Sequence, residues 1–146
     1  MVERLPTRSA LQLKGIQPAS ITCPLCNEVP ETCEHLFVSC QFAQMVCIVI
    51  VQWCKIPNFL TFSMLDLIQI NDLLTGSTKR KKLIHAITLV YLWSIWRMRN
   101  KVVFEQTPIL VPVVVEEIKY MSCQWVKNRL REGNLNWDRW RRFELF

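Results

Sequence analysis

The chain has 146 residues, of which 51% are hydrophobic and only three are glycine. This composition excludes a largely disordered protein, because disordered chains carry too few apolar residues to form a core. The length is that of one domain with room for an appended segment. The net charge of +6 is uneven: residues 1–76 hold four Lys/Arg against six Asp/Glu, and residues 77–146 hold fourteen against six. The basic second half favours an anionic partner, either nucleic acid or an acidic membrane surface.

Two apolar stretches bear on a membrane location, Met45–Val51 and Leu83–Trp96. A spanning helix needs about 20 predominantly apolar residues, and both stretches are shorter. The first residues also lack the basic-then-apolar pattern of a secretory leader. Seven cysteines in such a chain argue against a disulfide framework and for a reducing compartment. We therefore expect no membrane span and a nuclear or cytoplasmic location.

The first predicted helix covers Thr7–Lys14, with Thr7 as its N-cap and Gly15 at its end. From Glu34 to about Cys54 the sequence is apolar on nearly all sides. The β-branched residues in the middle of this segment favour a β-strand by their local propensity. However, about twenty residues without Gly or Pro favour one buried helix, since strands usually run ~4–8 residues.

More helices are predicted in the second half. Ser63 is placed to cap a short helix over Met64–Leu74. A long helix is predicted from about Lys79 to Glu105, because apolar residues recur there at three- and four-residue spacing. Val111–Arg131 predicts a further helix, and Asn136–Phe146 is an aromatic and basic tail. The expected fold is mainly α: a small zinc-stabilised N-terminal module, made of a Cys-x2-Cys turn and a helix, followed by a helical C-terminal region.

Four potential metal ligands fall within eighteen residues, in the pattern C-x2-C-x8-H-x4-C. They are Cys23, Cys26, His35 and Cys40. A Cys-x-x-Cys turn directs two thiolates at one centre, and a later His/Cys pair completes the tetrahedron that Zn²⁺ prefers. Four protein ligands leave no position for water, so the pattern predicts one structural zinc and no catalytic metal.

Two alternatives accompany this assignment. The cysteines are also compatible with ordinary buried thiols, as Cys47, Cys54 and Cys123 are expected to be. Cys33 lies two residues before His35 and is a possible competing ligand. Residues five apart lie about 140° apart around an α-helix, so one of the last two ligands must sit at a helix end, and we expect it to be His35 in the first turn.

Several stretches together resemble the reverse-transcriptase zinc-binding domain of plant LINE-type (non-LTR) retrotransposons. They are Leu5-Pro6-Thr7-Arg8, Leu11, Gly15-Ile16, Cys23-Pro24-Leu25-Cys26, Glu31, Glu34-His35-Leu36-Phe37-Val38-Ser39-Cys40, Trp53-Cys54-Lys55-Ile56-Pro57 and, more loosely, Trp93-Ser94-Ile95-Trp96-Arg97-Met98-Arg99-Asn100. The resemblance implies that the four residues above are the zinc ligands. It also implies an N-terminally truncated zinc-binding domain at 1–57, followed by a helical basic region at 58–146.

The resemblance further implies an accessory module from a polyprotein whose polymerase is RNA-directed. This chain by itself is not expected to be an enzyme. Two-metal nucleotidyl transfer needs clustered carboxylates. The three aspartates, Asp66, Asp72 and Asp138, are each isolated in the sequence, and no two of them are adjacent. The chain is expected to be a fragment of the parent reverse transcriptase polyprotein.

The partner expected for the basic region is RNA or DNA. Arginines and lysines neutralise phosphates, and tryptophans stack on unpaired bases. The residues proposed for these contacts are Lys79, Arg80, Lys81, Lys82, Arg97, Arg99, Arg139, Arg141, Arg142, Trp137 and Trp140. In the opposing interpretation the charges are solvated helix faces and the aromatic side chains belong to the core. The rival function is a zinc-stabilised helical protein-interaction domain.

Overall fold

The computed structural model describes residues 5–56, 63–70, 74, 76–129 and 134–144. The regular elements within these residues are helical, and their β-type pairing is a single isolated bridge between Thr22 and Pro30. The prediction of a mainly α fold with a Cys/His cluster near the N-terminus is thereby confirmed.

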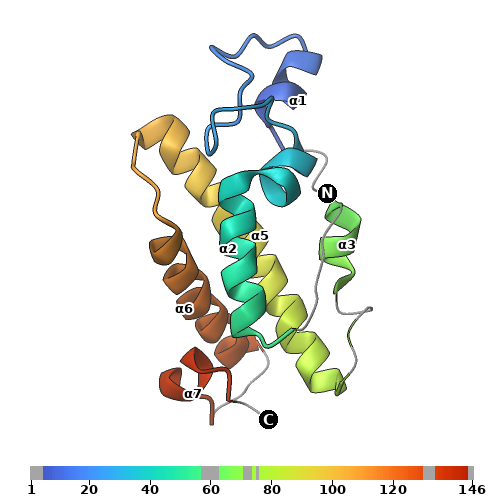
Figure 1. The fold of residues 1–146 in the computed structure, drawn as a ribbon, viewed down its shortest axis with the longest axis vertical. Coiled ribbons are helices and arrows are strands. Elements are labelled where there is room, and N and C mark those ends of the chain that lie inside the picture. The colour runs from blue at the N-terminus through green and yellow to red at the C-terminus, as the bar shows by residue number, and fades with distance from the viewer. Residues whose placement is uncertain (1–4, 57–62, 71–73, 75, 130–133, 145–146) are drawn as a thin grey trace.

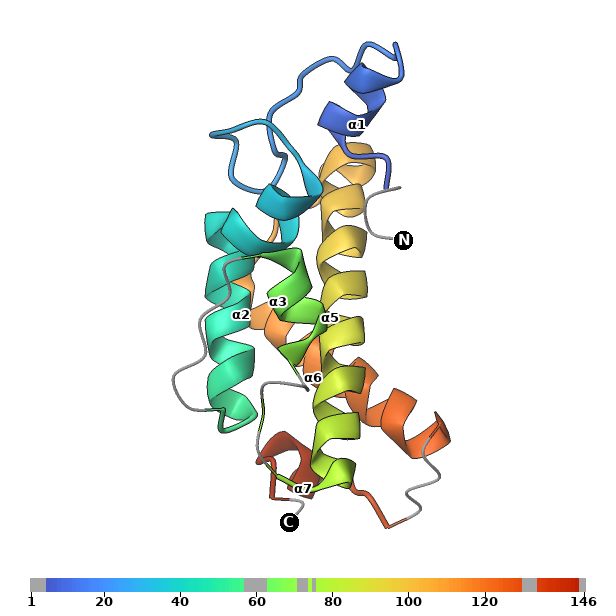
Figure 2. The ribbon, with the colours of Figure 1, turned by 90° about the vertical axis from the view of Figure 1, so that its right-hand side faces the viewer.

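Three long helices form the body of the molecule and run side by side (Figure 1). They are α2 (Gln41–Trp53), α5 (Thr78–Glu105) and α6 (Val111–Arg129). The short elements are α1 (Arg8–Leu13), the π-helical turn η2 (His35–Ser39), α3 (Met64–Ile68) and α7 (Trp137–Arg141). Figures 1 and 2 place α1 and the loop after it at the end of the bundle where α5 finishes, and α7 at the end where α5 starts.

Side-chain caps start several of these helices. The hydroxyl of Thr7 accepts from the N–H of Ala10 at 3.2 Å, and Ser63 caps α3 through Asp66 N–H at the same distance. Both predicted N-caps are therefore confirmed, because each satisfies a helix donor that would otherwise have no partner. Ser77 plays this role for α5, which begins one residue before the predicted start.

The predicted helix ends are less accurate. The helix α3 ends at Ile68, short of the predicted Leu74, and residues 71–73 lie outside the described residues. The predicted end of the next-to-last helix, Arg131, also lies outside them, and α6 is described as far as Arg129.

The single helix predicted from Glu34 to Cys54 is wrong. The segment is helical on both sides of Cys40, but Cys40 itself is extended, with φ −60° and ψ 129°. It ends η2 and serves as the N-cap residue of α2. The interruption changes the direction of the chain at one of the predicted ligands.

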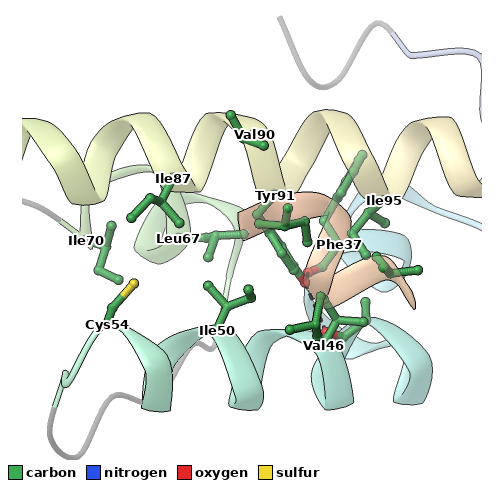
Figure 3. Packing of buried hydrophobic residues seen from close by; sticks show 14 of the residues in the cluster. Phe37, Val46, Ile50, Cys54, Leu67, Ile70, Ile87, Val90, Tyr91 and Ile95 are labelled. Atoms are coloured by element: carbon green, nitrogen blue, oxygen red, sulfur yellow. Dashed lines mark hydrogen bonds between the residues drawn. The ribbon is translucent and has the colours of Figure 1, made fainter. Parts of the chain in front are cut away.

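The core is one continuous cluster of buried side chains that runs from Cys23 to Phe143. Figure 3 shows its middle, where Ile50 of α2 faces Ile87 and Tyr91 of α5, with Leu67 of α3 beside them. The proposed division into 1–57 and 58–146 stays a prediction, although side chains from both parts share this core.

The sequence predicts that no helix of this chain spans a membrane. None of the helices in the described part of the chain combines the length and the hydropathy that a membrane span requires.

Candidate metal centre

The four predicted ligands converge at the end of the bundle where α5 finishes. Their ligand atoms all lie within 4.8 Å of one another. The sulfur atoms of Cys23 and Cys40 are 4.0 Å apart, and the sulfur of Cys26 lies 3.2 Å from Nε2 of His35. Cys23 and Cys40 are fully buried, whereas the other two are half-buried. The prediction that these residues share one site is confirmed.

A tight hairpin brings the first two cysteines together. The N–H of Cys23 donates to the carbonyl of Val29 at 2.7 Å, and the N–H of Asn27 donates to the carbonyl of Cys23 at 2.8 Å. Asn27 has a left-handed φ of 58°, a conformation that asparagine tolerates better than most residues. The chain thereby reverses direction just after Cys26, and both sulfur atoms point to one centre.

The other two ligands are paired by the π-helical turn. In η2 the N–H of Cys40 donates to the carbonyl of His35 at 2.6 Å, an i to i+5 hydrogen bond. This bond stacks residues five apart, which an α-helix does not do. The conflict between a five-residue spacing and α-helical geometry is resolved in this way. His35 lies in the first turn, as expected, and Cys40 lies at the following break.

Hydrogen bonds and burial set the acidity of the two buried thiols. The hydrogen bond to Cys40 raises the pKa of Cys23 most, burial raises it further, and the backbone N–H groups of Cys26 and Leu25 lower it. The same bond from Cys23 lowers the pKa of Cys40, burial opposes this change, and the N–H groups of Ala43 and Phe42 lower the pKa further. The pKa of Cys23 is therefore raised overall, and that of Cys40 is lowered overall, toward the thiolate that metal ions bind.

His35 is suited to the same role. Burial lowers its pKa, while the charges of Glu31 and Glu28 oppose that change. A lowered pKa keeps the imidazole neutral near pH 7, with a nitrogen lone pair available. Its backbone N–H donates to the hydroxyl of Thr32 at 3.0 Å, which fixes the start of the turn.

The donor set fits zinc. A tetrahedral Zn²⁺ with Zn–S near ~2.3 Å and Zn–N near ~2.0–2.1 Å requires S···S separations of about 3.8 Å and S···N separations of about 3.6 Å. The S···S separation of 4.0 Å between Cys23 and Cys40 and the S···N separation of 3.2 Å between Cys26 and His35 are close to these values. Three thiolates and one imidazole form a closed structural shell, so a bound zinc would hold the hairpin to the π-turn and supply no catalysis.

Cys33 is not part of the group of four. It is half-buried and packs against the hydrophobic core. The three downstream cysteines behave as predicted: Cys54 and Cys123 are buried, and Cys47 is half-buried. Burial raises the pKa of Cys54 to about 12 and that of Cys47 to about 11, which keeps both as neutral thiols.

The predicted nucleic-acid residues fall into two groups, and the larger group gathers at the end of the bundle opposite to the ligands. A guanidinium nitrogen of Arg80 donates to the carbonyls of Cys54 and Lys55, which brings the start of α5 to the end of α2. The indole N–H of Trp53 contacts the carbonyls of Trp140 and Arg141, at 3.2 and 2.9 Å, which brings α7 to the same place. We call this region the basic end; its residues are Lys55, Lys79, Arg80, Lys81, Lys82, Lys127, Arg129, Arg139, Arg141 and Arg142.

Two of the predicted contacts are corrected by burial. Arg99 is 4% exposed and forms an ion pair with Glu31, so its guanidinium does not face solvent. Trp140 is 0% exposed and donates its indole N–H to the carbonyl of Lys119 at 2.8 Å. Base stacking needs an exposed ring face, and Trp140 offers none.

The remaining two predicted contact residues, Arg97 and Trp137, are half-buried. Arg97 forms an ion pair with Glu117 on the surface, away from the basic end. Trp137 is half-buried, with its ring edge-on to Tyr120 at a centroid distance of 6.0 Å. The opposing interpretation of the tail aromatics, as core residues, therefore holds for Trp140 and in part for Trp137.

Sequence reasoning missed three residues that connect or complete these sites. Lys55 belongs to the basic end, but as an isolated lysine it carries no signal in the sequence. Glu31 pairs with Arg99 across 68 positions. The carboxylate of Glu34 accepts from the N–H of Met64 at 3.1 and 3.2 Å, and so ties the start of α3 to the ligand turn.

The comparison with known families bears on the first third of the chain. Residues 1–46 match the family model described as zinc-binding in reverse transcriptase, and the match contains all four ligands. No significant match to a curated protein or to a solved structure was found. The N-terminal third is thus similar to the zinc-binding region of reverse transcriptases, and Cys23, Cys26, His35 and Cys40 are positioned to bind one metal ion.

Proposed function

We propose that this chain is an accessory module of a retrotransposon reverse transcriptase, of the plant LINE type, that binds RNA or DNA through its basic end. The observation that carries the proposal is the convergence of basic residues from four separate segments at the end of the bundle away from the metal ligands. Such a surface attracts phosphates without reading sequence, because the contacts are electrostatic.

The charge balance at the basic end supports this proposal. Ten lysines and arginines meet two described acidic residues there, Asp138 and Glu144. Both acids lie beside Arg142, whose Nε donates to the carbonyl of Asp138 and lies 3.4 Å from the carboxylate of Glu144. Most of the positive charge therefore stays exposed and available to phosphates.

The metal centre has a different task in this proposal. The 28 residues of α5 separate the two ends by about 42 Å, at ~1.5 Å per residue. The zinc holds the N-terminal loops in place, while the basic end makes the contact. Because the shell is closed, the zinc itself would supply no catalysis. In this proposal the chain is not an enzyme by itself, and polymerase activity belongs to the parent polyprotein, an RNA-directed DNA polymerase.

The test is a titration of fluorescent single-stranded RNA and DNA at several salt concentrations. The slope of log K against log salt is about −0.7 per phosphate contact for single strands. Removing two contacts with Lys82→Gln and Arg141→Gln should reduce the slope by about 1.4. The matched control, Lys14→Gln with Lys101→Gln, removes two charges outside the basic end and should leave the slope unchanged. Equal effects of both pairs, or no binding at low salt, contradict the proposal.

The second candidate is a protein-interaction domain, and exposed apolar side chains favour it. Ile48 on α2 is 57% exposed, Trp93 on α5 is 48% exposed, and Phe104 near the end of α5 is 76% exposed. Nothing on these faces indicates which partner would cover them. The same titration separates the two functions, since a protein-binding surface predicts no salt-dependent affinity for RNA.

A further inference from the structure

A buried ion pair joins the metal-binding hairpin to the middle of the bundle. Glu31, which lies between the ligands Cys26 and His35 in sequence, is 0% exposed, and Arg99 of α5 is 4% exposed. Nε and Nη2 of Arg99 donate to the two carboxylate oxygens of Glu31, each at 2.8 Å. This two-point geometry fixes both the distance and the orientation of the partners.

The remaining polar groups of the pair are also satisfied. Oε1 of Glu31 accepts a second hydrogen bond, from the backbone N–H of Arg8 at 2.7 Å. Nη1 of Arg99 donates to the side chain of Asn100 at 3.0 Å, and its guanidinium lies 4.8 Å from the ring centroid of Trp96. A pair of this kind is costly to break, because the partner left behind is a buried and uncompensated charge.

Glu31 also closes the base of the hairpin that carries the first two ligands. Its N–H donates to the carbonyl of Ile21 at 2.8 Å, and its carbonyl accepts from Ser9 at 3.1 Å. The next rung toward the turn is the hydrogen bond between Cys23 and Val29. The position of the Glu31 side chain therefore determines where the hairpin sits against α5.

A second side chain of α5 fixes the other two ligands. The hydroxyl of Tyr91 lies 3.2 Å from the carbonyl oxygen of Phe37 (Figure 3). It also lies 3.1 Å from the carbonyl oxygen of Ala43, so its two contacts are on either side of Cys40 in the sequence. Both halves of the ligand set thus rest on α5, through Arg99 at the hairpin and Tyr91 at the π-turn.

We propose that Arg99 is a positioning residue of the metal centre, although it lies far along the chain from the last ligand. Through Glu31 it holds the hairpin of Cys23 and Cys26 in the geometry that binds zinc. A ligand set that is already ordered pays a smaller entropic cost on binding, and groups that support metal ligands typically change metal affinity by roughly 10–100-fold. This inference rests on the metal centre and is independent of nucleic-acid binding.

The test measures zinc affinity of the full chain by competition with a chromophoric chelator. Arg99→Met should weaken zinc binding roughly 10–100-fold with all four ligands intact. The matched control is Arg97→Met, two positions away on the same helix, where the arginine pairs with Glu117 at the surface. Its zinc affinity should stay within about two-fold of the unsubstituted chain, as expected for a surface ion pair.

A double-mutant cycle tests whether Glu31 and Arg99 act on zinc affinity as one unit, and a separate folding measurement distinguishes positioning from a general loss of stability. If the pair acts as a unit, Glu31→Gln combined with Arg99→Met weakens zinc binding no more than the worse single change does. Helical circular dichroism reports separately on the bundle, because α2, α5 and α6 lie outside the ligand loop. Tryptophan emission is not used for this purpose, because Trp96 packs against the guanidinium of Arg99. A variant that keeps its helical circular dichroism and unfolds cooperatively is folded.

Two results overturn the proposal directly. The first is a folded Arg99→Met variant that binds zinc within two-fold of the unsubstituted chain, and the second is an equal loss of zinc affinity in Arg97→Met. If Arg99→Met does not fold, Arg99→Lys is tested instead, because it keeps the buried charge but loses the two-point geometry. A several-fold loss of zinc affinity in Arg99→Lys supports the proposal, and unchanged affinity overturns it.

Discussion

The two ends of this bundle are built from different kinds of information. The metal end takes its four ligands from eighteen consecutive residues, and local turns bring them together. The basic end takes its charges from segments between residues 55 and 142, and only the packing of α2, α5, α6 and α7 brings them together. A locally encoded site is visible in a sequence, whereas a site assembled by tertiary structure appears there only as an uneven charge distribution.

The largest loss of stability is expected from a change at the four metal ligands. Cys40→Ser removes a ligand and also the buried sulfur at the junction of η2 and α2. Structural zinc contributes about 10–16 kcal/mol of apparent binding free energy in small zinc modules. We expect the variant to lose tight zinc binding and cooperative thermal unfolding, as followed by circular dichroism with one equivalent of zinc.

Cys47→Ser is the matched control for that change, because it alters a half-buried thiol outside the ligand group. It should retain stoichiometric zinc and a cooperative transition. A Cys40→Ser chain that unfolds like Cys47→Ser would show that the metal end does not depend on its fourth ligand.

The second largest loss of stability is expected at a buried tryptophan of α7. Trp140→Ala should cost about 3–5 kcal/mol of unfolding free energy, because the ring is fully buried and packs edge-on to Trp53 at 5.6 Å. Trp93→Ala, at a ring that is 48% exposed, should cost clearly less, because it removes a smaller buried apolar area. Urea denaturation measures both. Similar costs at the two positions would mean that Trp140 is not a core residue.

The helix starts illustrate what could be predicted from sequence. Thr7 and Ser63 are recognisable caps because the signal is a single side chain and the donor lies three residues away. The ligand spacing is equally local. The π-turn was not predictable, since apolar periodicity over Glu34–Cys54 is compatible with one α-helix, and the break at Cys40 follows from the i to i+5 bond.

The burial of Arg99 shows why the rest could not be predicted. An arginine beside two other basic residues on a helix indicates a solvated face, and its partner Glu31 lies 68 positions earlier. Two of the stretches on which the predicted resemblance is based, Glu31 and Trp93–Asn100, meet at this pair. Trp140 is a similar case, because three-residue spacing of aromatics does not tell which face a short tail helix buries.

The smallest effect is expected at the start of α5. Ser77→Ala removes the hydroxyl that accepts from the N–H of Arg80 at 3.1 Å, and should cost about 1 kcal/mol of unfolding free energy. Ser77→Asp keeps an acceptor at the cap and should cost less. Urea midpoints followed by tryptophan fluorescence report the difference. An unchanged midpoint in Ser77→Ala would show that the basic end is not ordered by this cap.

A closed metal centre formed by Cys23, Cys26, His35 and Cys40 can be examined by zinc-edge X-ray absorption of the purified full chain. We expect three sulfur neighbours near ~2.3 Å and one nitrogen near ~2.0–2.1 Å. A shell of four sulfurs would mean that Cys33 replaces His35, and an oxygen neighbour from water would mean that the shell is open. Either spectrum would show that these four residues do not form a closed shell.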